Sequence, residues 1–192
     1  MTTGMATAEV TRLVGELGPV TEAARRSFGG LSVVQLNWKP APTEWSIAQC
    51  LEHLMLINTP YIGIFERIAR GEWRPTLKER LPFLPRLFGK LVLAVVQPDT
   101  KRKVKAAAAF LPSQSAIPAD VVTRFAAHQA EVGRAMKAAA SRDLARTIIT
   151  SPVARFMTYS ALDACRIVVT HEQHHMVQAE RVLAGLRNSA WG

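Results

Sequence analysis

Cysteine is scarce in this chain, with Cys50 and Cys165 as the only two. Two thiols cannot build the framework of bridges that staples small secreted domains, so a reducing cytoplasm is the expected location. Long apolar runs are missing too, since the longest, such as residues 91–96, fall far short of the ~20 residues of a membrane span. The first ten residues lack the basic and apolar regions of a signal peptide. The sequence therefore predicts no membrane span.

Acidic residues are also few: 15 against 24 basic residues, for a net charge of +9. Most of the excess lies in residues 67–105, where eleven basic and three acidic residues give +8. Such a segment can attract nucleic acid, anionic lipid or an acidic substrate, or form a solvated loop. Because only 7% of the residues are aromatic and no nucleic-acid-binding motif accompanies the charge, a nucleic-acid partner is not expected.

Helical periodicity is present in four segments, approximately residues 7–31, 46–68, 118–140 and 160–183. Alternation typical of longer strands is absent, and 192 residues suffice for one domain with its own core. Residues 71–117 form a long, basic, proline-rich connection with one short amphipathic piece at 84–96. The sequence therefore predicts an all-α fold, a four-helix bundle in a single domain spanning residues 1–192.

Local signals mark several helix boundaries. Ser46 and Gln49 form a capping box before the second helix, with Trp45 at the position of a hydrophobic staple. Ser160 offers a cap for the fourth helix, and Gly185 is expected to end it. The third helix is expected to start near its first-turn proline, at position 118, and the pair at 18–19 (Gly-Pro) should kink or interrupt the first helix.

Three of the five histidines fall in the stretch HEQHHMVQ, residues 171–178. His171 and His175 are four residues apart, so on a helix they share one face, and this face is otherwise apolar. His53 lies on a similarly inward row of the second helix. Burying three imidazoles without partners is costly, and a shared metal ion removes that cost. The sequence therefore predicts one metal site formed by His53, His171 and His175, whereas a single histidine taken alone is better explained as a hydrogen-bonded core or surface residue.

Two stretches carry a family resemblance: LNWKPAPTEWSIAQCLEHL, which leads into the second helix, and THEQHHMVQAERVL in the fourth. Together they resemble the DinB/YfiT-like superfamily of metalloenzymes, and His53, His171 and His175 occupy the positions of that family's histidines. The resemblance implies an up-down-down-up bundle with a long crossover between helices 2 and 3, and frequently a homodimer. Many relatives carry arginine where this chain has His174.

Three neutral imidazoles leave at least one coordination position open, as in a catalytic rather than a structural site. Nitrogen ligands suit zinc, nickel or iron, and the donor set does not choose among these ions. The resemblance implies thiol-dependent S-transferase or isomerase chemistry on a small-molecule substrate, with a low-molecular-weight thiol as a further cofactor. Two alternatives stay open: a metal-dependent hydrolase, and a non-catalytic metal-binding module of the stress response.

Other polar residues are candidates for supporting roles. Gln178, one turn after His175, is the best placed to support a ligand or bind substrate. The remaining candidates for second-shell or substrate contacts are His174, Asn58 and Tyr61. Glu52 and Glu172 adjoin ligands but should turn away by about 100° on their helices. His128 is a weaker candidate for a ligand or base, and Cys50 is interpreted as a core residue.

Overall fold

The computed structural model describes residues 3–80, 84–97 and 107–189, and these are mostly helical. They contain six α-helices, two short 3₁₀ helices and one two-stranded sheet. The α-helices are α1 (Thr3–Phe28), α2 (Val33–Asn37), α3 (Ile47–Ala69), α4 (Leu84–Val95), α5 (Val121–Ala139) and α6 (Ala161–Asn188). The other elements are η1 (Lys78–Arg80), η2 (Ala108–Phe110), β1 (Ile148–Thr150) and β2 (Thr158–Ser160).

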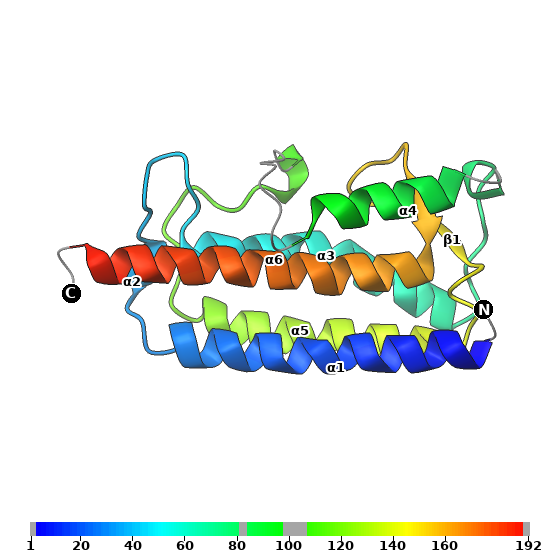
Figure 1. Cartoon of the computed structure of the whole chain (residues 1–192), viewed down its shortest axis with the longest axis horizontal. Coiled ribbons are helices and arrows are strands. Elements are labelled where there is room, and N and C mark those ends of the chain that lie inside the picture. Colours follow the sequence, from blue (N-terminus) through cyan, green and yellow to red (C-terminus); the bar gives the residue numbers. More distant parts are fainter. Residues whose placement is uncertain (1–2, 81–83, 98–106, 190–192) are drawn as a thin grey trace.

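The four long helices α1, α3, α5 and α6 extend along the longest axis of the molecule (Figure 1). Their buried apolar side chains form two clusters, which occupy successive stretches of the same four helices. Where the two stretches meet, α3 carries buried His53 and Asn58, α5 carries buried Gln129, and α6 carries buried Glu172 and His175. The core is therefore apolar toward both ends and polar in between.

The predicted caps of the second and fourth helices are present. The backbone N–H of Gln49 donates to Ser46 Oγ at 3.1 Å, and Gln49 Oε1 accepts from the Ser46 N–H at 3.2 Å. At the start of α6, Ser160 Oγ accepts the N–H of Asp163 at 3.0 Å. These bonds satisfy N–H groups that have no partner within a helix, so they fix where α3 and α6 begin.

Several predicted boundaries were wrong. Helix α1 continues through Pro19 without interruption and ends at Phe28, while α5 begins at Val121 rather than near position 118. Helix α6 continues past Gly185 to Asn188. A Cβ at Gly185 would lie 3.4 Å from the Trp38 ring, so this glycine provides room for a close contact instead of ending the helix.

The short helix α2 and the β1–β2 hairpin were not predicted, although Ser32 and Gln35 form a capping box at the start of α2 like that of Ser46 and Gln49. The two strands pair antiparallel in the register Ile148↔Ser160. With three residues each they are too short to show a period-two pattern. The hairpin leads directly into α6, so it helps to set the start of the helix that carries His171 and His175.

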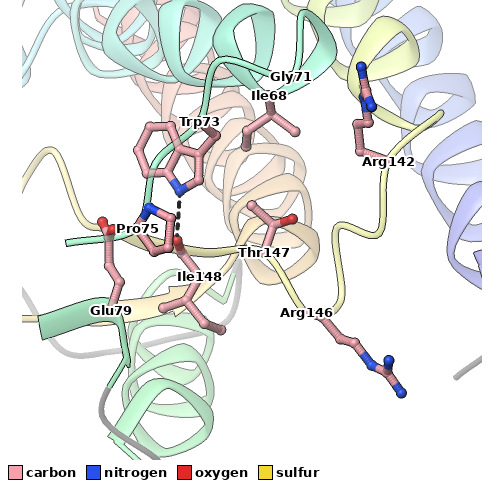
Figure 2. A pocket seen from close by; sticks show the side chains of 9 residues that line it. All are labelled: Ile68, Gly71, Trp73, Pro75, Glu79, Arg142, Arg146, Thr147 and Ile148. Atoms are coloured by element: carbon pink, nitrogen blue, oxygen red, sulfur yellow. Dashed lines mark hydrogen bonds between the residues drawn. The ribbon is translucent and has the colours of Figure 1, made fainter. Parts of the chain in front are cut away.

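The long connection is anchored to this hairpin. Trp73 Nε1 donates to the Ile148 carbonyl at 3.0 Å (Figure 2). Glu79 Oε1 accepts from the Thr150 N–H and hydroxyl at 2.8 and 2.9 Å. A pocket of ≈380 Å³ lies at this junction and contains none of the candidate ligands. The predicted amphipathic piece of the connection is present as α4. Residues 81–83 and 98–106 of the connection lie outside the described residues.

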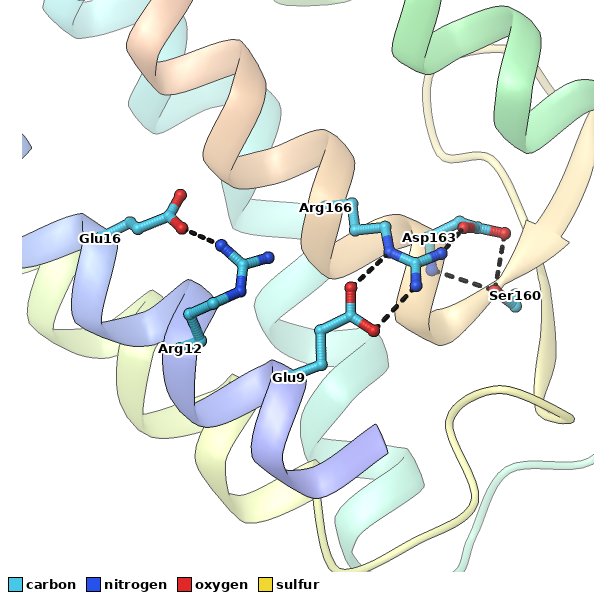
Figure 3. A network of polar contacts seen from close by, with 6 residues as sticks. All are labelled: Glu9, Arg12, Glu16, Ser160, Asp163 and Arg166. Atoms are coloured by element: carbon cyan, nitrogen blue, oxygen red, sulfur yellow. Dashed lines mark hydrogen bonds and ion pairs between the residues drawn. The ribbon is translucent and has the colours of Figure 1, made fainter. Parts of the chain in front are cut away.

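An ionic network joins α1 to α6 near the hairpin. The Arg166 guanidinium donates to both oxygens of Glu9, each at 2.8 Å, and also to Asp163 Oδ1 at 2.7 Å (Figure 3). Its hydrogen bonds to Glu9 are the main cause of the lowered pKa of that carboxyl. Because bidentate pairing is geometrically specific, the network fixes how α6 lies against α1. None of the described helices is both long enough and apolar enough to cross a bilayer.

Candidate metal centre

The structure brings together three histidines from two helices. His53 lies on α3, and His171 and His175 lie one turn apart on α6. One nitrogen from each ring lies within 4.8 Å of the corresponding nitrogens of the other two. His53 and His175 are 2% and 7% exposed, while His171 is half-buried. The cluster therefore lies at the edge of the core, and His171 is its least buried member.

Hydrogen bonds fix the orientation of two of the rings. His53 Nδ1 lies 2.7 Å from the Phe110 carbonyl oxygen, and His175 Nδ1 lies 2.8 Å from Gln178 Oε1. Both oxygens can only accept, so each Nδ1 carries the proton and each Nε2 keeps its lone pair. In metalloproteins, ligand histidines commonly use their second nitrogen in this way.

The third ring completes a donor set that fits a metal ion. The Nε2 atoms of His171 and His175 are 3.0 Å apart. Two lone pairs at this distance repel each other unless a proton or a cation lies between them. Ligands at about 2.0–2.1 Å from one tetrahedral ion are about 3.3 Å apart, close to the observed spacing. The cluster can therefore hold a metal ion.

Electrostatics keep these rings neutral. Removal from water lowers the pKa of all three histidines. The pKa of His175 falls well below the usual range, and that of His171 falls to about 3. Repulsion between protonated neighbouring imidazoles adds to the shift for His171 and His175. At neutral pH the lone pairs are thus available to a cation without prior loss of a proton.

Sequence reasoning missed two contributors to the site. The Trp45 ring centroid lies 4.7 Å from that of His53 and 5.6 Å from that of His175, with the latter pair stacked. Trp45 therefore forms an aromatic wall of the cluster, beyond its predicted role next to the α3 cap. The Phe110 carbonyl is a backbone group, so no residue pattern could have identified it. The only available signal was the proximity of Trp45 to the start of the histidine-bearing helix.

Two of the predicted supporting residues lie next to the cluster. Gln178 contacts His175 directly, as described above. The ring centroid of His174 lies 5.1 Å from that of His175, and its Nδ1 lies 2.9 Å from the Gln97 carbonyl oxygen. His174 thus joins the end of the α4 segment to the edge of the site.

The other supporting candidates have different partners. Asn58 Nδ2 donates to Glu172 Oε1 at 2.7 Å, and the Tyr61 hydroxyl shares a hydrogen bond with that of Tyr159. Glu172 is fully buried, and burial raises the pKa of its carboxyl well above the usual range. The burial of Glu172 was not predicted from the sequence. Among the contacts that the structure describes, none joins Asn58 or Tyr61 to the three histidines, so their substrate-binding role stays a prediction.

The weaker candidates also have other environments. His128 Nε2 lies 3.2 Å from Thr59 Oγ1, in a contact between α5 and α3. Glu52 Oε2 accepts the Ser113 N–H at 2.6 Å and so holds the end of the long connection. Cys50 lies in the core, as predicted, and burial raises the pKa of its thiol to about 12.

Comparison with known proteins identifies the family. A family model described as DinB superfamily matches residues 19–179, which include all three histidines and Gln178. The chain belongs to the DinB superfamily. No curated protein and no solved structure matches it. Membership confirms the resemblance inferred from the sequence, and a metal-binding role for this DinB-superfamily protein is consistent with the three-histidine cluster.

Replacing Gln178 with alanine is expected to lower metal affinity about 10–100-fold while the ligands remain in place. The His175 ring would lose the acceptor that fixes its Nδ1 proton and its orientation. Competition titration with a chelator of known affinity measures this change. Gln173 lies on the same helix and donates to Glu16 instead, so Gln173→Ala serves as the control. Equal affinities for the two variants would contradict the role of Gln178.

The metal-free protein is expected to lose stability as the pH falls below about 6.5. The three histidines have lower pKa values in the folded state than the unfolded value of about 6.5, so the unfolded state binds more protons at acid pH. Each histidine lowers the free energy of unfolding by up to ~1.4 kcal/mol for each pH unit of acidification in this range. The stability concerned is fully present above about pH 6.5 and is lost as the pH falls through the folded-state pKa. Urea unfolding at several pH values measures this slope. A triple variant with glutamine at positions 53, 171 and 175 should show a smaller slope, and an unchanged slope would refute the expectation.

Proposed function

We propose that this protein is a divalent-metal-dependent enzyme that acts on a small molecule, by thiol-dependent S-transferase or isomerase chemistry. The observation that carries the proposal is a donor set of three neutral imidazoles with no carboxylate among them. Such a set leaves the full charge on the ion and at least one coordination position open. The site should therefore favour an anionic ligand such as a thiolate.

Each side chain has a defined part in this proposal. His53, His171 and His175 hold the ion, while Gln178 and the Phe110 carbonyl keep two of the rings in their metal-binding tautomer. When bound, the ion lowers the pKa of a coordinated thiol or water and so supplies a nucleophile at neutral pH. Trp45 shields His53 and His175 from water on one side, and the half-buried His171 marks the side open to substrate.

A thiol-transfer assay on metal-loaded protein tests the proposed reaction. With N-acetylcysteine and 1-chloro-2,4-dinitrobenzene, a carbon–sulfur bond forms, chloride leaves, and the thiol proton passes to buffer. We expect turnover with zinc, nickel or iron that falls to background after His171→Ala. Turnover of p-nitrophenyl acetate without thiol would instead identify the hydrolase alternative. Absence of both activities would overturn the enzymatic proposal in favour of the non-catalytic module.

The architecture expected from the resemblance forms part of the proposal. In Figure 1, α1 and α6 run from the N-terminal end of the molecule toward the opposite end, and α3 and α5 run back. These directions support an up-down-down-up bundle in a single domain, with the crossover between α3 and α5. The homodimer and the cytoplasmic location stay predictions.

A further inference from the structure

Helix α4 has an apolar face that no described element covers. It lies outside the four long helices (Figure 1). Its inner side packs through Gly89, where an added Cβ would lie 2.8 Å from Asp163 Oδ2, and through Val92 and Leu93 against the core. On the outer side, Leu87 is 62% and Leu91 is 47% exposed. These exposed leucines on the outer side of α4 therefore have no partner among the described residues.

The outer face combines leucines with a cation. Leu87, Lys90, Leu91 and Ala94 are all exposed and follow the spacing of a single helical stripe. The hairpin loop adds Phe156, which is 69% exposed and packs edge-on against Phe88 of α4 at 6.4 Å between ring centroids. The outer α4 face therefore consists of Leu87, Lys90, Leu91, Ala94 and Phe156.

The charge around this face restricts the kind of partner. The α4 part of the face carries Lys90, and exposed Arg155 adjoins Phe156. A second copy docked face to face would bring these cations of the two copies together, and their like charges would repel each other. Nucleic acid is a poor fit, because the exposed leucines cannot stack on bases. Apolar side chains together with cations match the interface of an anionic bilayer.

We propose that the outer α4 face docks this protein on the surface of an anionic lipid bilayer. Leu87, Leu91 and Phe156 enter the headgroup boundary, and Lys90 and Arg155 pair with lipid phosphates. Lipid binding at one apolar stripe is weak and reversible unless an electrostatic attraction is added, and Lys90 and Arg155 provide that attraction. The proposal does not depend on a metal in the histidine site.

Co-sedimentation of the full chain with vesicles tests the docking. Vesicles of phosphatidylcholine with about 30% phosphatidylglycerol should bind the protein, and pure phosphatidylcholine should bind it at least about tenfold less. Binding should also weaken when salt rises from about 50 to about 300 mM, because the Debye length shortens. The double substitution L87E/L91E should reduce binding about tenfold or more, because it removes the apolar contact and adds repulsion.

A charge-matched variant distinguishes a specific role of the outer α4 face from an effect of the overall charge on vesicle binding. V33E/V34E adds the same two charges at exposed apolar positions on α2, and it should bind like the wild type. K90E provides a milder change within the face and should weaken binding without removing apolar area. Equal loss in L87E/L91E and V33E/V34E would overturn the proposal, as would absence of binding to anionic vesicles. A self-associated wild type that L87E/L91E converts to monomer would assign the face to a second copy and likewise overturn it.

Discussion

His171→Ala protein, reconstituted with zinc and freed of excess metal, is expected to retain less than about 0.1 ion per chain, against about one for the wild type. The substitution leaves His53 and His175 as the only two imidazole ligands, and two ligands rarely hold a divalent ion against dilution. Elemental analysis of the protein after gel filtration measures the number of zinc ions per chain.

Two other histidines provide matched controls. His174 adjoins the cluster but bonds to the Gln97 carbonyl, and His128 bonds to Thr59 on another face of α3. His174→Ala and His128→Ala should each retain about one ion per chain. If His171→Ala kept its full metal content, or if His128→Ala lost it, the assignment of ligands would be wrong.

Removal of the metal is expected to lower the melting temperature by about 8–16 °C. An ion that binds only the folded state stabilises it by about 4 kcal/mol when its concentration is a thousand times the dissociation constant. For a chain of this size, each kcal/mol corresponds to about 2–4 °C. Differential scanning calorimetry at pH 7.5, with and without chelator, measures the shift.

The triple variant with glutamine at positions 53, 171 and 175 is the control for this shift. Its melting temperature should not respond to metal or chelator, because the amides are poor ligands for transition metals. An equal response in the variant and the wild type would place the stabilising ion elsewhere in the molecule.

Much of the candidate site could be predicted because its signals are local. The four-residue spacing of His171 and His175 places both on one face of any helix, and Ser46 with Gln49 fixes where the helix of His53 begins. Gln178 was selected from the same periodicity and lies against His175. Local hydrogen bonding and helical repeat therefore determine most of the donor set and one of its supports.

The rest depends on contacts between distant segments. The Phe110 carbonyl reaches His53 from the long connection, and Gly185 makes room for Trp38 rather than ending a helix. Glu172 was expected only to turn away from the ligands, yet it is fully buried and bonded to Asn58. Each of these features arises from packing between helices, which a periodic pattern in one segment does not encode.

X-ray absorption spectroscopy at the metal edge of zinc-loaded protein tests the central claim most directly. The account predicts three imidazole nitrogens at about 2.0–2.1 Å and one exchangeable oxygen ligand from water or hydroxide, with the multiple scattering of histidine rings. In protein loaded without added thiol, a sulfur at about 2.3 Å, or fewer than three imidazoles bound to the zinc, would contradict it.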